Sequence, residues 1–255
     1  MLGQFLVAQV FAFFIIFCRI GSAVMLVPAF GETYVPPQLR LAFTFMLTLL
    51  LVPLIGKAIP ALPGSPLALT LLVACEILTG LFIGTLCNIL ISATHTAGMI
   101  FSFQSGLSSA VLYDVTQSSQ GSIIGNFMGL LAIVLLFATD LHYLILRGIT
   151  ESYSVFTPGQ WPPVKDFMET AVRTLSDTFM IAAQVSEPLI VAGTLLFLGA
   201  GVLSRLMPTM QVFFVITAPQ LIITIFVLTT TFSAVMLWFM EFYREKLIMI
   251  FSYVK

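Results

Sequence analysis

The sequence predicts an all-helical membrane protein that crosses the bilayer several times. The chain is 59% hydrophobic and only 8% charged, with a mean hydropathy of +1.10. A soluble domain carries about 25% charged residues, so this composition cannot cover a soluble surface. Apolar runs also approach the roughly 20 residues that a helix needs to span a bilayer. The net charge of −1 leaves no basic face, which excludes nucleic acid as a partner.

Six apolar runs are the candidate helices. The first, residues 5–30, has no cleavage site of small residues after it, so we expect it to remain as a helix rather than be removed as a signal peptide. The second, residues 41–55, is short for a full span. The third, residues 67–103, fits one tilted span with an extension, or two segments broken near Gly80 and Gly84. The remaining runs cover residues 123–139, 179–206 and 213–240.

Proline and glycine clusters predict where these helices are joined. They occupy residues 28–37, 53–66 and 158–163, and the residue before a proline is disfavoured in a helix. Three further prolines stand inside apolar runs, where the missing N–H predicts bent helices or helices broken before they span. These are Pro188, Pro208 and Pro219.

The largest polar segment, residues 140–177, is expected to be a connection that contains an amphipathic helix. Its apolar residues from Val164 to Phe179 recur at intervals of three and four, which places them on one helical face. Such a face packs on a membrane surface or against a partner.

Four ionisable residues lie inside or beside apolar runs: Arg19, Glu76, Glu187 and Asp140. A charge at the centre of a bilayer costs at least about 2.5–3.5 kcal/mol, so these side chains should face protein or water. We expect structural pairing between helices, for example of Arg19 with Glu76 or with Glu187. A proton or substrate pathway through the same residues remains the alternative.

The sequence contains no pattern of an enzyme. Motifs for a nucleophile elbow, a zinc protease, a phosphate-binding loop and a dinucleotide site are all absent from it. His95 and His142 are far apart and have no other ligand-type residue at the next helical turn, so no catalytic, metal or cofactor site is predicted. Met207 and Met210 flank Pro208, where they either fill a core or seal a pore.

One polar segment interrupts the apolar middle of the chain. Residues 104–122, QSGLSSAVLYDVTQSSQGS, are rich in Gly and Ser, while the runs on both sides are almost uncharged. Irregular backbone cannot face lipid, because its N–H and C=O groups would be unpaired there. The segment must therefore lie in water, against protein, or inside a water-lined passage.

Several local motifs together resemble the FliR family of flagellar type III secretion export-gate proteins. They run from Arg19-Ile20-Gly21 and VPAFGETYVPPQLR, through AGMIFSFQSGLSSA and DLHYLIL, to the late run EPLIVAGTLLFLGAGVLSRLMPTMQVF. The resemblance covers nearly the whole chain. The sequence departs from the family where members often have Pro-Gln-Met-Asn and this chain has Pro208-Thr209-Met210-Gln211.

The resemblance implies a single non-enzymatic subunit, residues 1–255, of a multi-subunit helical gate in the bacterial inner membrane at the flagellar basal body. FliP-type and FliQ-type subunits would be its neighbours, FlhB-type and FlhA-type proteins would dock on the gate, and unfolded export substrates would pass through it. It also implies that residues 106–122 plug the channel, with the following residues in the plug: Gly106, Leu107, Ser108, Ser109, Ala110, Val111, Leu112, Tyr113 and Asp114. The alternatives are a secondary transporter of ions or small molecules, and the virulence-type counterpart of the gate.

Overall fold

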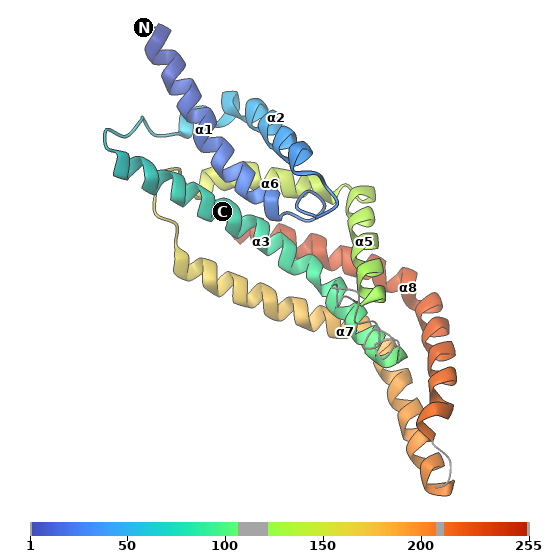
Figure 1. Cartoon of the computed structure of the whole chain (residues 1–255). Coiled ribbons are helices and arrows are strands. Elements are labelled where there is room, and N and C mark those ends of the chain that lie inside the picture. Colours follow the sequence, from blue (N-terminus) through green and yellow to red (C-terminus); the bar gives the residue numbers. More distant parts are fainter. Residues whose placement is uncertain (1, 107–121, 208–211, 254–255) are drawn as a thin grey trace. The chain divides into compact units, whose positions relative to one another are not determined.

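The computed structural model describes residues 2–106, 122–207 and 212–253, and all its regular elements there are helices (Figure 1). The all-helical fold predicted from composition is therefore confirmed. Five helices are long and apolar enough to cross a membrane, or up to six if the bent pair α5 and α6 counts as one span. In chain order the elements are α1 (Leu2–Leu26), α2 (Pro37–Ile55), the short 3₁₀ turn η1 (Gly56–Ala58), α3 (Pro66–Ser105), α5 (Ile123–Ala138), α6 (Leu141–Val155), α7 (Val164–Leu206) and α8 (Val212–Tyr253).

The third apolar run forms one continuous helix of 40 residues, α3, so the alternative of a break near Gly80 and Gly84 is wrong. These two glycines instead let α1 approach α3. A Cβ atom on Gly80 would collide with the Ser22 side chain and the Arg19 carbonyl, and one on Gly84 would lie 2.7 Å from the Ala23 carbonyl oxygen. Glycines four residues apart allow such backbone contact between apolar helices.

The polar segment 140–177 is more helical than we expected. Residues 141–155 form α6, whose buried positions recur at helical spacing: Leu141, Ile145, Gly148, Ile149, Ser152 and Tyr153. The predicted amphipathic helix is not separate either, because it is the first part of α7, which continues without interruption to Leu206. The buried positions of residues 141–155 follow the spacing of an amphipathic helix, which was not predicted from the sequence.

Two of the prolines inside apolar runs do not interrupt their helices. Both α7 and α8 remain helical across Pro188 and Pro219, so the expectation that these helices are broken there is wrong. A proline removes one hydrogen bond of the helix, and flanking bonds hold the remainder together. The proline clusters that precede α2, α3 and α7 do mark joints between helices, but the joint predicted at 53–66 begins later, because Pro53 lies inside α2. Pro208 lies outside the described residues.

The chain divides into two compact units, and the divisions fall within α3, α7 and α8. Unit 1 comprises Met1–Leu90, Phe137–Thr174 and Arg244–Lys255. Unit 2 comprises Ile91–Leu136 and Leu175–Tyr243. Each unit has buried residues of its own and is described separately below.

Unit 1 is built around α1, whose inner face is fully buried at Ile15, Ile16 and Ile20. Helix α2 packs beside α1, with the Phe13 and Phe45 rings edge to face at 5.1 Å between centroids. Arg40 at the start of α2 holds the connection between the two helices, because its Nη2 donates to the carbonyls of Glu32 and Val35 at 2.9 and 3.3 Å.

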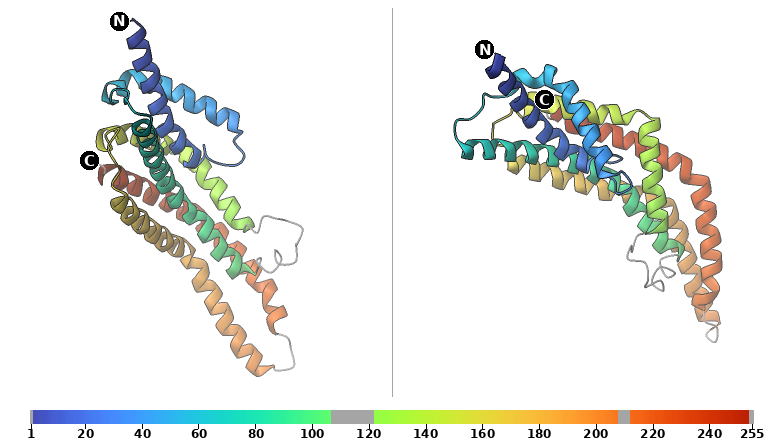
Figure 2. Two further views of the ribbon diagram at one scale, coloured as in Figure 1. Left: turned by 60° about the vertical axis from the view of Figure 1, so that its left-hand side comes forward. Right: turned by 45° about the horizontal axis from the view of Figure 1, so that its top comes forward.

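Unit 2 is a bundle of α5 with parts of α3, α7 and α8. Its α7 part buries every third or fourth residue, namely Thr178, Ala182, Val185 and Leu189. Helices α3 and α5 meet at Gly98 and Gly125, where an added Cβ atom would collide with the facing backbone. Both views in Figure 2 show α7 and α8 forming a hairpin that extends past the end of α3.

We predict that the substitution Gly80→Val destabilises unit 1 by about 1–3 kcal/mol, the usual cost of overpacking a filled contact. The added side chain would force α1 away from α3. Thermal unfolding of the detergent-solubilised chain measures the effect. Gly199→Ala is the matched control, because Gly199 is a helical glycine with no atom within 4 Å of an added Cβ. Equal melting temperatures for the two variants would contradict the close contact.

Candidate functional site

The predicted charge pair lies in the core of unit 1. Arg19 of α1 donates from Nε to Glu76 Oε2 at 2.6 Å and from Nη2 to Glu76 Oε1 at 3.0 Å. Both side chains are 1% exposed. This two-pronged geometry is the strongest form of a carboxylate–guanidinium contact. Of the two partners that the sequence allowed for Arg19, the structure brings Glu76 to it.

The remaining donors of Arg19 reach the end of α6. Nη1 lies 3.2 Å from the Ser152 carbonyl oxygen and 3.4 Å from the Ser152 Oγ, and Nη2 lies 2.9 Å from the Phe156 carbonyl oxygen. A guanidinium has five N–H donors, and here each has an acceptor. The cation also sits at the carboxyl end of a helix, where the helix dipole favours positive charge.

An aromatic ring completes the surroundings of Arg19. The guanidinium carbon lies 4.1 Å from the centroid of the Tyr153 ring, within the range of a cation–π contact. The Tyr153 hydroxyl donates to the Ile16 carbonyl at 3.3 Å. We call Arg19, Glu76, Ser152, Tyr153 and Phe156 the Arg19 cluster. It ties α1, α3 and α6 together and leaves the guanidinium no donor for a ligand.

The other two charges singled out from the sequence lie elsewhere. Glu187 belongs to the α7 part of unit 2 and is exposed. Asp140 lies in the turn between α5 and α6, where it is exposed and has a left-handed φ of 59°. Aspartate tolerates this conformation better than most residues. Among the residues that the structure describes, no group of three or more His, Cys, Asp or Glu side chains could hold a metal ion.

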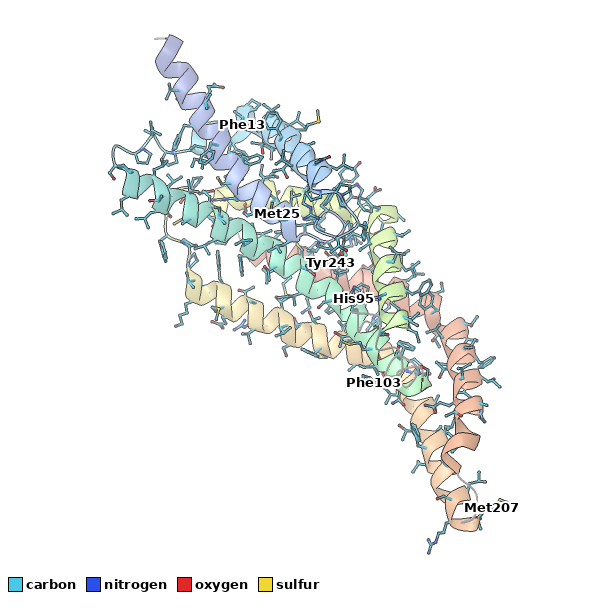
Figure 3. The ribbon with its side chains drawn as sticks, viewed as in Figure 1. Phe13, Met25, His95, Phe103, Met207 and Tyr243 are labelled. Carbon is cyan, nitrogen blue, oxygen red and sulfur yellow. The ribbon has the colours of Figure 1, made fainter. Side chains whose placement is uncertain are left out.

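The predicted plug lies mostly outside the described residues, which include its first member, Gly106, but not 107–114. Gly106 ends α3 with a φ of +75°, and its N–H donates to the Phe103 carbonyl at 3.3 Å. Glycine is the usual residue at such a helix end, because side chains are strained at positive φ. Figure 3 labels Phe103 on the last turn of α3, where it is 69% exposed.

Serine hydroxyls hold the far end of the segment against α3. Ser122 begins α5 as its N-cap, since its Oγ accepts from the Gly125 N–H at 2.9 Å. The same Oγ donates to the Gly98 carbonyl at 3.0 Å and lies 2.6 Å from the Ser102 Oγ. The two described residues that flank 107–121, Gly106 and Ser122, therefore both lie beside the last two turns of α3.

Two more helices contact this place. The Gln220 amide of α8 donates to the Gln104 carbonyl, one of the last four carbonyls of α3, which have no donor within the helix. Gly193 of α7 lets the Gln104 side chain approach, because an added Cβ would lie 2.6 Å from its Oε1. We call Ser102, Gln104, Gly106, Ser122 and Gln220 the base of the segment.

Sequence reasoning missed most of the base and most of the Arg19 cluster. A serine directly before the apolar run of α5 is a helix-start signal that could have identified Ser122. A lone amide after Pro219 in an apolar run could have drawn attention to Gln220. Ser152 and Phe156 were not expected as partners of Arg19, which bonds to the backbone carbonyls of both and to the Ser152 hydroxyl. Of the suggested channel-seal residues, Met207 is 46% exposed and Met210 lies outside the described residues.

We predict that Arg19→Met destabilises the chain by about 3–5 kcal/mol, because it leaves the Glu76 carboxylate buried without its partner. The double variant Arg19→Met/Glu76→Leu should recover part of that loss. A double-mutant cycle of unfolding in detergent measures both effects. Arg147→Ala is the matched control: its pair with Glu151 is exposed, so the cost should stay below about 1 kcal/mol. Similar losses for Arg19 and Arg147 would contradict a structural role of the cluster.

We also predict that Ser122→Ala loosens the start of α5, at a cost of about 1 kcal/mol, the usual value of an N-cap. Hydrogen exchange of the amides of residues 123–126 should become faster. Ser204→Ala is the control, because the Ser204 hydroxyl bonds only to the carbonyl of Gly201 in its own helix. Unchanged exchange in the Ser122 variant would show that the base does not depend on this hydroxyl.

Known proteins of one family match this sequence over nearly the whole chain. Residues 10–245 match the family described as bacterial export proteins, family 1. The flagellar biosynthetic protein FliR of Caulobacter vibrioides is 31% identical over 239 residues, which cover 94% of this chain and 95% of that protein. The FliR protein of Bacillus subtilis is 31% identical over 207 residues, covering 80% and 79%. Yop proteins translocation protein T of Yersinia pestis is 28% identical over 156 residues, or 60% of each chain. The chain belongs to the bacterial export protein family 1.

Proposed function

We propose that the chain is a non-enzymatic subunit of the flagellar type III export gate, through which unfolded flagellar proteins are secreted. The observation that carries this proposal is the match to the Caulobacter vibrioides FliR over 94% of this chain and 95% of that protein. The match to the Yersinia translocation protein covers only 60% of each chain. The flagellar branch is therefore favoured over the virulence-type counterpart.

Exposed apolar surface supports a role within an assembly. In the candidate span of α2 only 17% of residues are buried, and in those of α7 and α8 only 11%. We propose that FliP-type and FliQ-type subunits cover much of this surface, that FlhB-type and FlhA-type proteins join the gate, and that the complex sits in the bacterial inner membrane.

The base of the segment supports the proposal that residues 106–114 plug the channel. A plug that opens and closes needs a fixed attachment, and the hydrogen bonds of Gly106, Ser122 and Gln220 provide one on α3, α5 and α8. Met207 is proposed to line the passage as well, since its side chain is half exposed rather than part of the core of unit 2.

A secondary transporter fits the structure less well. Such a protein needs charged groups that are available to a substrate or a coupling ion near mid-membrane. Arg19 and Glu76 are the obvious candidates, but all five N–H donors of Arg19 bond to protein acceptors. A ligand would have to displace those bonds.

The first test is the isolation of the tagged chain from membranes of its native host, together with the phenotype of a strain that lacks it. We expect several small helical partners in a fixed ratio and the loss of both motility and export of flagellar proteins. A chain recovered alone, from a mutant that still swims, would contradict the proposal. Loss of virulence-factor secretion with normal motility would assign it to the virulence-type gate.

The plug is tested by deleting residues 107–117, which spares the described base residues Gly106 and Ser122. We expect the complex to assemble and the membrane to leak ions or small solutes, measured as ion flux in cells that express the gate. A fully assembled deletion variant with a tight membrane would contradict plugging.

Crosslinking distinguishes a segment that lines the export channel from one that is only an inert scaffold. A cysteine that replaces Ser109 should crosslink to an export substrate trapped in the gate, because a plug residue lies against the passing chain. A cysteine at exposed Ser154 of α6, far in sequence from the segment, is the control. No substrate adduct at Ser109, with trapped substrate present, would favour the scaffold.

A further inference from the structure

Within unit 2, α7 has two opposite faces. Its core face contains Thr178, Ala182, Val185 and Leu189, all buried. At 100° per residue, the opposite face carries a line of exposed residues spaced by four and three, which we call the outer stripe. The outer stripe consists of Met180, Gln184, Glu187, Val191, Thr194 and Leu198.

Glu187 is the only charged residue from position 178 to position 204. Its carboxylate has no hydrogen bond or ion pair with any residue that the structure describes. Unit 2 contains one Lys or Arg among its described residues, Arg205, which lies 18 positions further along α7. That separation is about 27 Å along a helix, too far for a contact within the same helix.

Pro188 adds a second acceptor to the same face. A proline has no N–H, so the Gln184 carbonyl loses the donor that it would have in a regular helix. Glu187 and Gln184 are three residues apart and therefore neighbours on the helix surface. A carboxyl group and a carbonyl without its helical donor thus lie together on an apolar helix.

The Glu187 carboxyl and the Gln184 carbonyl indicate what kind of surface covers the outer stripe. Lipid would leave the carboxylate unpaired, which is strongly unfavourable because an apolar medium cannot solvate a charge. Two α7 helices in the same orientation and register would place Glu187 against Glu187, since Arg205 lies 18 positions away along the helix. A helix of a different subunit that carries a Lys or Arg at this level satisfies both acceptors.

We propose that the outer stripe of α7 is an interface for a helix of another gate subunit, which places a lysine or arginine against Glu187 and the Gln184 carbonyl. The inference rests on the proposed function, because it needs the assembled gate. It adds which face of which helix makes the contact and what charge the partner must carry there.

The test compares charge variants of the full-length chain in membranes of its native host. Glu187→Lys should reduce the amount of partner subunits that co-purify by about tenfold or more, since it places like charges together in an interface. Glu187→Gln should reduce it less. Glu169→Gln is the matched control: Glu169 is also on α7, and its ion pair with Arg173 is exposed. Normal assembly of Glu187→Lys would overturn the inference.

Photocrosslinking identifies the occupant. A benzophenone side chain at Val191 or Leu198 should crosslink to one different subunit, and Glu187→Lys should abolish that product while Glu169→Gln preserves it. Replacing a Lys or Arg in the crosslinked helix by Glu should restore assembly of Glu187→Lys. Crosslinks to a second copy of this chain, or to lipid alone, would overturn the inference.

Failure of this inference is distinguishable from failure of the proposed function. A wild-type chain that purifies without partners contradicts the gate itself. A wild-type chain that purifies with partners, and whose Glu187→Lys variant does so equally well, contradicts only the outer stripe.

Discussion

Burial of the Arg19 charge is the constraint on which unit 1 depends. A guanidinium that is 1% exposed must have its charge balanced and its five donors occupied, because an unpaired buried charge costs several kcal/mol. Glu76 supplies the charge, and two carbonyls and the Ser152 hydroxyl at the end of α6 take the remaining donors. Three helices must therefore meet at one point. Gly80 lies one turn beyond Glu76 and permits the close approach of α1 that this meeting requires.

Unit 2 meets a different constraint with neutral groups. Its helices approach at Gly98, Gly125 and Gly193, and its internal polar contacts at the base run from serine and glutamine side chains to backbone carbonyls. Neutral hydrogen bonds of this kind contribute about 0.5–1.5 kcal/mol each to stability. They hold helix ends in place, and breaking one does not leave an unpaired buried charge. Glu187, on the α7 part of unit 2, is exposed instead. Unit 1 thus satisfies its central charge internally, whereas we propose that a partner subunit pairs with Glu187.

Composition and periodicity were sufficient to predict the fold class and most helix boundaries, because apolar residues mark the helix surfaces that are buried or in contact with lipid. The same rules failed where two opposing effects had to be compared. Pro188 and Pro219 remove single hydrogen bonds, but the bonds around them outweigh that loss, and α7 and α8 continue. Gly80 and Gly84 looked like helix breaks, yet their effect is exerted on a neighbouring helix that the sequence does not display. The sequence also does not show which helices are neighbours, so only the structure could decide whether Glu76 or Glu187 pairs with Arg19. The backbone carbonyls of Ser152 and Phe156 carry no sequence signal at all.

The contrast between the two polar sites bears on how such a gate can be both stable and movable. A charge cluster whose donors are all occupied has no alternative partners, so displacing it exposes several groups at once; it suits the part of a subunit that must stay fixed. The base uses few and weaker bonds at the two ends of one segment, and each can be broken without stranding a charge. In our proposal Glu187 falls between these cases, because it gains its partner only on assembly. The strength of each contact would then correspond to its proposed role: to hold the fold, to anchor the plug, or to select a neighbour.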